Sequence, residues 1–277
     1  MITARNLTKS YRKKDVLTGV DLDLEAGGIH GLLGRNGVGK STLLGIIGGQ
    51  IKASSGELRV FGEQPWDNAR VMDAVALTGV DTPYPGAWSG AAILEAAGLR
   101  YPRWDEDGAR SLVDDFALTG ALETRYSFMS RGQKAMIGIV VGLASCAPLT
   151  LLDEPYVGLD THNRRVFYEH LLAMGESGRT FIVATHHVHE SAKVLDSFLI
   201  LGRDGRIARH CNAADVADEY VVLSAPALPR IDEALDLRGS AGLQRALVPR
   251  SAAAGVGVVR KDTADLDDVI GAMLEAS

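Results

Sequence analysis

Nine consecutive residues, Gly34–Thr42, have the types and the spacing of a loop that binds phosphate. They read G-R-N-G-V-G-K-S-T, which fits the pattern G-x-x-x-x-G-K-S/T. Its glycines let the backbone wrap closely around an anion, and successive N–H groups at a helix start then point at the oxygens. Lys40 offers a mobile cation, and Ser41 offers a hydroxyl ligand to Mg²⁺. The predicted phosphate-binding residues are Gly34, Arg35, Asn36, Gly37, Val38, Gly39, Lys40, Ser41 and Thr42.

Two neighbouring carboxylates form the second candidate feature. The apolar run Leu149–Leu152 is followed directly by Asp153 and Glu154. Such a run is typical of a parallel strand that is buried on both faces. In open α/β sheets ligands bind at the carboxyl ends of the strands, so both carboxylates are expected at a ligand site.

The phosphate loop has the flanking elements that its chemistry requires. The apolar run Ile29–Leu33 precedes it and indicates a buried strand, and Leu43, Leu44, Ile46 and Ile47 follow it at helical spacing. The alternative, a Gly-rich turn with a chance Lys-Ser pair, does not explain this strand–loop–helix order. A further buried strand, Thr180–Ala184, ends just before His186.

The remaining patterns predict an α/β chain with a mostly helical insertion at about residues 87–146. Ser130 is the expected N-cap of a helix whose apolar residues Ile137, Val140, Val141 and Ala144 recur at i, i+3, i+4 and i+7. The other expected strands are Ile2–Tyr11, Asp15–Leu24, Leu58–Phe61, Leu77–Val80 and the hairpin Phe198–Leu201 with Ile207–His210, and the other expected helices are Val71–Ala76 and Thr161–Met174.

Residues 213–277 form a predicted C-terminal appendix to a main domain of residues 1–212. The segment holds eleven acidic and six basic residues, so it carries most of the negative charge of the chain. Tyr220–Leu223, Ala246–Val248 and Val256–Val259 are expected strands, and an amphipathic helix starts at Leu266. Because about 60 residues are near the lower limit for independent folding, we expect the appendix to pack on the main domain.

Composition limits the classes of function. The chain has 277 residues, of which 46% are hydrophobic and 23% charged, as in ordinary globular proteins. The net charge of −6 argues against a general nucleic-acid binder. Cys146 and Cys211 form no metal-type motif, and we expect both to be reduced in the cytosol. We see no signal peptide and no apolar run of about 20 residues, so a membrane process would need another chain.

Five features in fixed order resemble the nucleotide-binding subunit of ABC transporters. They are the phosphate loop, Ser130-Arg131-Gly132-Gln133, Asp153-Glu154-Pro155, Gly158-Leu159-Asp160 and His186. The Ser-x-Gly-Gln sequence about 20 residues before the acidic strand distinguishes this family from other phosphate-loop proteins. The resemblance covers about residues 1–212 and implies a P-loop NTPase fold with a mixed β-sheet core and a helical subdomain. The small C-terminal α/β appendix predicted above is added to this core.

The resemblance also implies roles for single residues. Lys40, Ser41 and Thr42 hold the phosphates of ATP and Mg²⁺, and Asp153 binds the metal through water. Glu154 polarises the attacking water, and His186 contacts the γ-phosphate. Tyr11, which by residue type alone is a half-buried strand residue, is the aromatic that stacks on adenine. Ser130, Gly132 and Gln133 form a signature loop that closes on ATP in the opposite subunit, and Asp160 communicates between the two sites.

Two positions depart from the family pattern. Arg131 stands where the signature loop usually has Gly. Val80-Asp81-Thr82 stands where a Gln usually meets the metal and the membrane subunit, so Asp81 is our candidate for that position. An acidic residue there, and the ending Ala264–Val269, resemble the multidrug, antibiotic or ABC-2-type exporter branch. His187 and His189 beside His186 suggest a metal site, but a solvated helix start is the better interpretation.

The expected function is ATP hydrolysis that drives export through a separate membrane permease. The subunit would be peripheral on the cytoplasmic side and would work as a homodimer or with a paralogous ATPase. The alternatives are an importer ATPase, a soluble ATPase acting on DNA or ribosomes, and a P-loop kinase. The kinase alternative does not explain the signature loop or Glu154.

Overall fold

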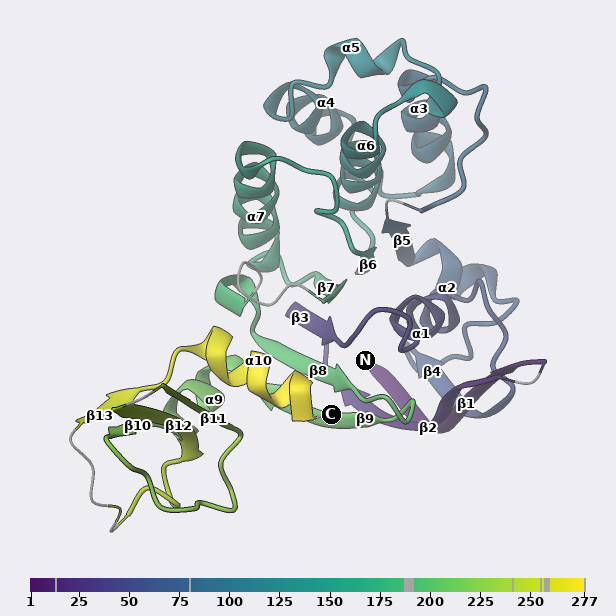
Figure 1. Ribbon diagram of the computed structural model, residues 1–277. Coiled ribbons are helices and arrows are strands. Elements are labelled where there is room, and N and C mark those ends of the chain that lie inside the picture. Colours follow the sequence, from purple (N-terminus) through teal and green to yellow (C-terminus); the bar gives the residue numbers. More distant parts are fainter. Residues whose placement is uncertain are drawn as a thin grey trace.

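The computed structural model describes residues 1–12, 14–79, 81–186, 192–240, 242–254, 256 and 260–276 (Figure 1). The strands are β1 (Ile2–Tyr11), β2 (Lys14–Leu24), β3 (Gly28–Leu33), β4 (Ser55–Val60), β5 (Val75–Gly79), β6 (Leu149–Asp153), β7 (Thr180–Thr185), β8 (Ser197–Leu201), β9 (Ile207–Asn212), β10 (Tyr220–Ala225), β11 (Asp236–Ser240), β12 (Leu243–Pro249) and β13 (Arg260–Thr263). The helices are α1 (Lys40–Ile47), α2 (Ala69–Asp73), α3 (Gly90–Arg100), α4 (Glu106–Asp115), α5 (Thr119–Leu122), α6 (Arg131–Ala144), α7 (Thr161–Gly175), α9 (Ala213–Glu219) and α10 (Leu266–Ala276), with two 3₁₀ turns, η1 (Tyr126–Phe128) and η2 (Ala192–Val194).

A six-stranded sheet in the order β5-β6-β7-β3-β8-β9 forms the centre of the molecule. Adjacent strands of this sheet run parallel, except β8 and β9, which run antiparallel to each other. The interior strands are the continuous apolar runs that the sequence predicts, because a parallel sheet is covered on both faces. Leu33 pairs with Thr185, and Asp153 pairs with both Ala184 and Gly79, so the ends of these four strands lie at one edge. The predicted mixed α/β fold is confirmed.

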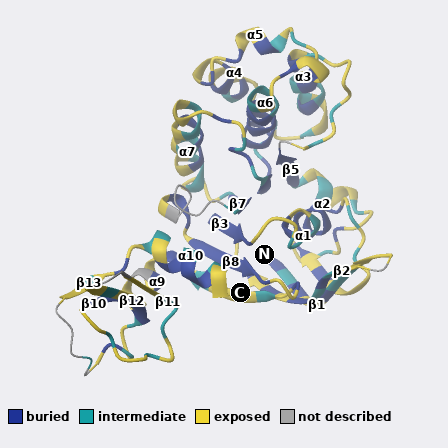
Figure 2. Cartoon of the chain, viewed as in Figure 1, coloured by how far each residue is buried: buried dark blue, intermediate teal, exposed yellow. Residues whose placement is uncertain are grey.

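Helix α1 lies between this sheet and a second, antiparallel sheet in the order β2-β1-β4. Its apolar residues Leu43, Leu44, Ile46 and Ile47 are buried in one core cluster with side chains from both sheets. Figure 2 shows this core as buried ribbon on both sides of α1. Packing on two sides fixes the helix start, and with it the loop that precedes it.

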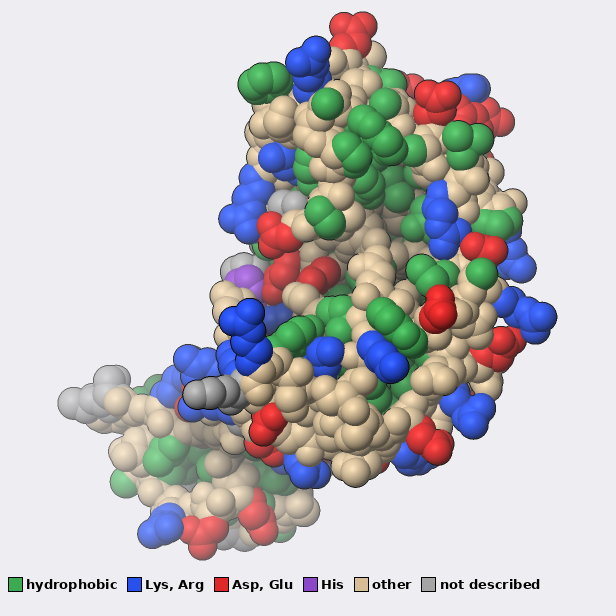
Figure 3. Space-filling view, turned by 90° about the vertical axis from the view of Figure 1, so that its right-hand side faces the viewer, with side chains coloured by type: hydrophobic (Ala, Val, Ile, Leu, Met, Phe, Trp, Pro, Cys, Tyr) green, Lys and Arg blue, Asp and Glu red, His purple; other side chains and the backbone are tan. Residues whose placement is uncertain are grey.

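The insertion at residues 87–146 is helical, as predicted, and forms the upper part of the molecule in Figure 1. Helix α6 runs from there down to the sheet. Gly138 and Gly142 allow its close approach to β5, since an added Cβ on either would lie 2.8 Å from a Thr78 side-chain atom. Figure 3 shows hydrophobic side chains gathered on the outer surface of this part of the molecule.

One predicted helix was wrong at its C-terminal end. Val71–Ala76 was expected to be helical, but α2 ends at Asp73 and β5 begins at Val75. Asn68 caps the start of the helix by accepting hydrogen bonds from two backbone N–H groups, and Val75 then pairs with Leu149 in the sheet. Pairing with a distant strand overrode the local helical pattern. Val80, the last residue of the strand predicted at Leu77–Val80, lies outside the described residues.

The C-terminal segment contains a four-stranded antiparallel sheet in the order β11-β12-β10-β13, with α9 before it and α10 after it. Phe198 and Ile200 of β8 share one buried cluster with Val216 of α9 and Ile270 of α10. The appendix therefore packs on the main sheet, as its small size suggested. Helix α9 and strands β11 and β13 were not predicted, and of the expected strand Val256–Val259 only residue 256 is described.

No helix in the described part of the chain is long and apolar enough to cross a bilayer.

Candidate functional site

The loop Gly34–Gly39 connects β3 to α1, as the sequence predicts. Gly37 and Gly39 have φ angles of +76° and +122°, which glycine adopts at little cost. An added Cβ on Gly39 would lie 2.9 Å from the Val16 side chain of β2, so this backbone also needs the space that glycine leaves. The loop thus has the shape that lets main-chain N–H groups at the start of α1 face an anion.

Lys40 is the cation at the centre of this loop. Its side chain is only 6% exposed, and its Nζ donates hydrogen bonds to the carbonyl oxygens of Gly34 at 2.8 Å and Arg35 at 3.3 Å. The same Nζ lies 3.4 Å from Oε1 of Glu154. The positive charge is therefore held between the phosphate loop and the end of β6.

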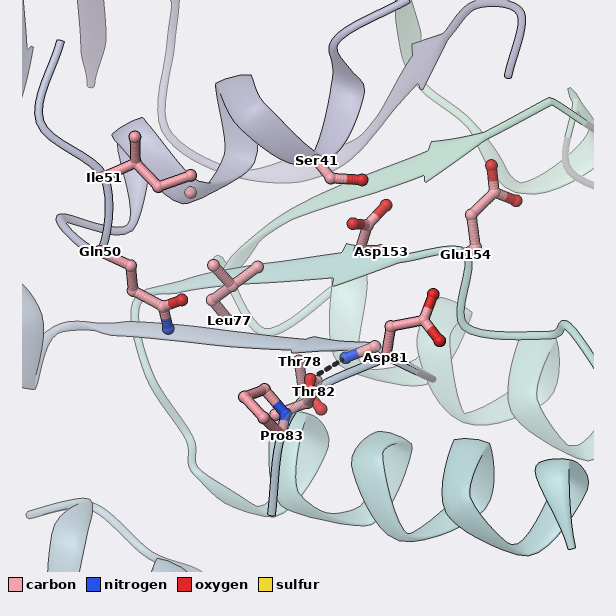
Figure 4. Close-up of a pocket in the computed structure, with 12 residues that line it drawn as sticks. Ser41, Gln50, Ile51, Leu77, Thr78, Asp81, Thr82, Pro83, Asp153 and Glu154 are labelled. Atoms are coloured by element: carbon pink, nitrogen blue, oxygen red, sulfur yellow. Dashed lines mark hydrogen bonds between the residues drawn. The ribbon is translucent and has the colours of Figure 1, made fainter. Parts of the chain in front are cut away.

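A cavity of about 610 Å³ opens beside the loop at the carboxyl edge of the sheet. Ser41 of α1, Asp81 in the turn after β5, and Asp153 and Glu154 at the end of β6 line it, so three segments contribute (Figure 4). Burial raises the pKa of Asp153, and the negative charges of Glu154 and Asp81 raise it further. A hydrogen bond from Ser41 and the positive charge of Lys40 lower this pKa, but the net shift is upward. The acidic groups therefore destabilise one another in the absence of a compensating cation.

This donor set fits Mg²⁺. Within the described part of the chain, Oδ1 of Asp153 and Oε2 of Glu154 are buried without a hydrogen-bond partner. The Ser41 hydroxyl and the Asp153 carboxylate point toward one another across the cavity wall in Figure 4. Carboxylate and hydroxyl oxygens are the ligands that Mg²⁺ prefers. Ser41 and Asp153 are therefore the residues placed to hold the ion, with Asp81 on the opposite wall.

Glu154 and His186, the predicted catalytic pair, lie side by side at the ends of β6 and β7. Nδ1 of His186 donates a hydrogen bond of 2.9 Å to Oε1 of Glu154. The backbone of Glu154 has a φ angle of +48°, which is unusual for a residue other than glycine and costs on the order of 1–3 kcal/mol. Its N–H donates to the carbonyl oxygen of Ala184 in β7, which holds the residue in this conformation. The structure thus brings Lys40, Glu154 and His186 together, whereas His187 and His189 lie outside the described residues.

The residues of the signature loop lie elsewhere. Ser130 caps α6, and its hydroxyl accepts a hydrogen bond of 3.1 Å from the Gln133 backbone N–H. Gln133 completes this capping box, because its Oε1 accepts from the Ser130 N–H at 2.9 Å. Neither Ser130, Gly132 nor Gln133 is among the described residues that line the cavity. Arg131 begins the same helix and is exposed.

The signature loop packs on the segment that follows Glu154. An added Cβ on Gly132 would lie 2.6 Å from the carbonyl oxygen of Gly158, and Gly158 has a φ angle of +89°. Two residues later, Asp160 caps α7 by accepting a hydrogen bond of 2.8 Å from the Asn163 N–H. Residues 154–160 therefore connect Glu154 to the segment that packs on Gly132.

Gly132→Ala is expected to shift this contact, because the methyl group meets a main-chain carbonyl that cannot rotate away. We expect a loss of about 1–3 kcal/mol in the free energy of unfolding and a reduced rate of ATP hydrolysis. Thermal unfolding and a phosphate-release assay measure the two effects. The control is Gly120→Ala, where an added Cβ meets no atom within 4 Å. Equal stability and equal rates of ATP hydrolysis in the two variants would contradict the close contact between Gly132 and Gly158.

Tyr11 ends β1, where it pairs with Lys14 of β2. Its side chain is 45% exposed, and Nζ of Lys9 lies 4.8 Å from the ring centroid. An exposed ring at the end of this hairpin does little for the core, so the interpretation as a half-buried strand residue loses support. Tyr11 does not line the cavity described above.

The sequence did not point to several residues of the cavity wall. Gln50 and Thr78 also line it, as does Thr82, which the sequence pattern indicates only as the neighbour of Asp81. Thr82 closes a tight turn after β5, because its Oγ1 accepts a hydrogen bond of 2.8 Å from the Gly79 N–H. A Thr after Asp in a Pro-rich loop is a signal for such a turn, but it does not reveal that the turn faces the cavity.

Comparisons with known proteins agree with this geometry. A family model described as ABC transporter matches residues 17–157. The zinc transport system ATP-binding protein TroB of Treponema pallidum (strain Nichols) is 30% identical over 203 residues, which cover 71% of this chain and 76% of that protein. The Nod factor export ATP-binding protein I of Rhizobium meliloti (strain 1021) is 30% identical over 214 residues, which cover 75% of this chain and 63% of that protein.

The fold also matches solved structures. The dimeric structure of MJ0796, a bacterial ABC transporter cassette, superposes with a TM-score of 0.67 at 22% sequence identity. The superposition covers 77% of this chain and 99% of that chain. At this level of identity the likeness establishes the fold.

Proposed function

Since the chain belongs to the ABC transporter family and is an ATP-binding subunit that hydrolyses ATP, we propose that it drives export through a separate membrane permease from the cytoplasmic face of the membrane. ATP hydrolysis by this chain is supported most directly by the contacts of Glu154 with Lys40 of the phosphate loop and with His186. The cargo class that we propose is a drug, a peptide or a cell-envelope compound. The net charge of −6 favours a protein partner over nucleic acid.

The proposed chemistry divides the site between charge neutralisation and activation of water. The main chain of Gly34–Gly39 and Lys40 bind the β- and γ-phosphates of ATP, with Ser41 and Thr42 at the helix start. Mg²⁺ would be held by Ser41 and Asp153, and it would neutralise charge on the phosphate oxygens. Glu154 accepts a hydrogen bond from the attacking water and orients it toward phosphorus, while the bond from phosphorus to the ADP oxygen breaks. His186 orients Glu154 through their 2.9 Å hydrogen bond.

We propose that two copies, or this chain and a paralogue, complete each site. Support comes from the position of Ser130, Gly132 and Gln133, which lie outside the cavity of their own chain. Their helix start would meet the γ-phosphate that is bound by the opposite subunit. The MJ0796 cassette, whose fold this chain shares, forms a dimer.

A transport experiment with the reconstituted complex distinguishes export from import. One relative with 30% identity is an export protein and the other belongs to a zinc transport system. The test reconstitutes the chain with the membrane protein that co-purifies with it, in vesicles whose ATPase subunits face outward. Export predicts that ATP added outside drives a lipophilic cationic dye into the lumen. ATP-driven release of loaded solute from the lumen would instead indicate import.

Tyr11→Ala is expected to weaken ATP binding by on the order of 1–3 kcal/mol, because the adenine base loses its stacking partner. Titration with a fluorescent ATP analogue measures the change. Trp66→Ala is the matched control, since Trp66 is 40% exposed and Tyr11 is 45% exposed. A lower melting temperature with unchanged affinity would show that Tyr11 is only a strand residue.

A further inference from the structure

Tyr126 connects two parts of the molecule that the mechanism treats separately. We propose that Tyr126 is a positioning residue that couples the Asp81–Thr82 turn at the cavity wall to the signature loop at the start of α6. The inference rests on the proposed function and deepens it, because it names what sets the position of Ser130 from within the same chain.

The first half of the connection is the turn that ends β5. Gly79 pairs with Asp153, and an added Cβ on Gly79 would lie 2.4 Å from the Asp153 carbonyl oxygen. The Thr82 N–H donates to the Gly79 carbonyl oxygen at 3.1 Å, and the Gly79 N–H donates to the Thr82 hydroxyl at 2.8 Å. Asp81 therefore lies two residues beyond the Gly79–Asp153 pair and directly before Thr82, whose two hydrogen bonds with Gly79 close the turn.

The second half is the Tyr126 side chain, which is 8% exposed. Its hydroxyl donates a hydrogen bond of 3.0 Å to the Thr82 carbonyl oxygen, across 44 residues of sequence. Its ring packs edge-on against Tyr84, with centroids 5.5 Å apart. Burial raises the pKa of Tyr126, and the nearby charge of Asp81 raises it further, so the phenol stays a donor.

From Tyr126 the connection continues to the signature loop. Nζ of Lys134, in the first turns of α6, lies 4.9 Å from the Tyr126 ring centroid, and the Lys134 N–H donates to the Ser130 carbonyl oxygen at 3.0 Å. The Met129 N–H donates to the Tyr126 carbonyl oxygen at 3.2 Å, which fixes the residue just before Ser130. Ser130 is thus attached to Tyr126 through both the chain and the helix.

The backbone around Tyr126 strengthens the same connection. The Tyr126 N–H donates to the Trp88 carbonyl oxygen at 2.7 Å, and the Ser127 N–H donates to the Gly86 carbonyl oxygen at 3.1 Å. The loop that leaves the cavity and the segment that enters the signature loop therefore run side by side. A shift of the Asp81–Thr82 turn cannot leave the position of Ser130 unchanged unless the Tyr126–Thr82 hydrogen bond breaks.

Tyr126→Phe tests the role of the hydroxyl. The variant keeps the ring, and with it the contacts to Tyr84 and Lys134, but leaves the Thr82 carbonyl oxygen without this donor. The control is Tyr101→Phe, which removes the hydroxyl of another partly buried tyrosine that packs on Arg100. Both variants lose one phenolic hydroxyl, so a general effect on stability should appear in both.

The main readout is hydrogen exchange, measured with and without Mg²⁺ and ATPγS at a protein concentration where light scattering shows single chains. In the parent chain we expect nucleotide to slow exchange at residues 34–42 and to change it at residues 126–134. In Tyr126→Phe the response at 34–42 should persist and the response at 126–134 should disappear. Tyr101→Phe should behave like the parent chain. In steady-state assays Tyr126→Phe should lower kcat by about five- to tenfold and change KM by less than about twofold.

Three results would overturn the inference. One is a full response at 126–134 in Tyr126→Phe, and another is an equal loss of that response in both variants. The third is a parent chain in which nucleotide slows exchange at 34–42 without any change at 126–134. If nucleotide slows exchange at 34–42 in none of the chains, the result contradicts ATP binding at the phosphate loop, which is part of the proposed function. The coupling through Tyr126 is then refuted as well, because it depends on that binding.

Discussion

Glu154→Gln lowers the rate of ATP hydrolysis by about 10²–10⁴-fold and leaves ATP binding intact, if Glu154 activates water as proposed. The amide has the same shape but cannot accept a proton or polarise water as a carboxylate does. Oε1 of Glu154 accepts a hydrogen bond from His186 at 2.9 Å and lies 3.4 Å from Nζ of Lys40, so the carboxylate is already positioned by two partners.

The same substitution should stabilise the ATP-bound dimer. Glu154 and Asp81 both raise the pKa of Asp153, so the amide removes one negative charge from a site that must also accept phosphate charge. Size-exclusion chromatography with Mg²⁺ and ATP should show a dimer that persists. Glu169→Gln is the control, because Glu169 is an exposed carboxylate that lies 3.7 Å from Arg165 on α7. Turnover near that of the parent chain would remove Glu154 from the mechanism.

Lys40→Ala should lower the affinity for ATP by about 10- to 100-fold, because the phosphates lose a charge-assisted hydrogen bond in a buried setting. Lys40 is 6% exposed, and its Nζ donates to the Gly34 carbonyl oxygen at 2.8 Å, so its charge is held inside the loop. A fluorescent-ATP titration measures the affinity, and thermal unfolding checks that the loop still folds.

Lys52→Ala provides the comparison for this variant, since Lys52 is an exposed lysine that does not line the cavity. It should bind ATP as the parent chain does. Unchanged binding by Lys40→Ala would contradict the assignment of Gly34–Thr42 as the phosphate loop, and with it the proposed function.

The local features of the site could be predicted from the sequence because they depend on neighbours in the chain. The run Leu149–Leu152 followed by Asp153 specifies a buried strand with a carboxylate at its end, and the structure has this strand as β6. Ser130 was expected to cap α6 because a hydroxyl before a helical pattern satisfies free N–H groups, and the structure contains that cap. The reciprocal bond, in which Oε1 of Gln133 accepts from the Ser130 N–H, does not follow from the signature sequence alone.

Contacts between distant segments could not be predicted in this way. The hydrogen bond between Tyr126 and Thr82 joins residues that are 44 positions apart. The local sequence around either residue does not indicate that the other is its partner. The start of β5 at Val75 depends on its pairing with Leu149, which a local helical pattern cannot anticipate. Strand β11 (Asp236–Ser240) is an edge strand with the sequence D-L-R-G-S, which lacks the alternation by which strands are recognised. The boundary between residues 1–212 and 213–277 stays a prediction.

In the proposed dimer one chain carries the phosphate loop and Glu154, while a second chain supplies the signature loop. Turnover per chain, measured against chain concentration at saturating Mg²⁺ and ATP with light scattering in parallel, tests it most directly. Turnover per chain should rise with concentration and follow the fraction of paired chains. A turnover that stays constant while scattering shows only single chains would contradict it.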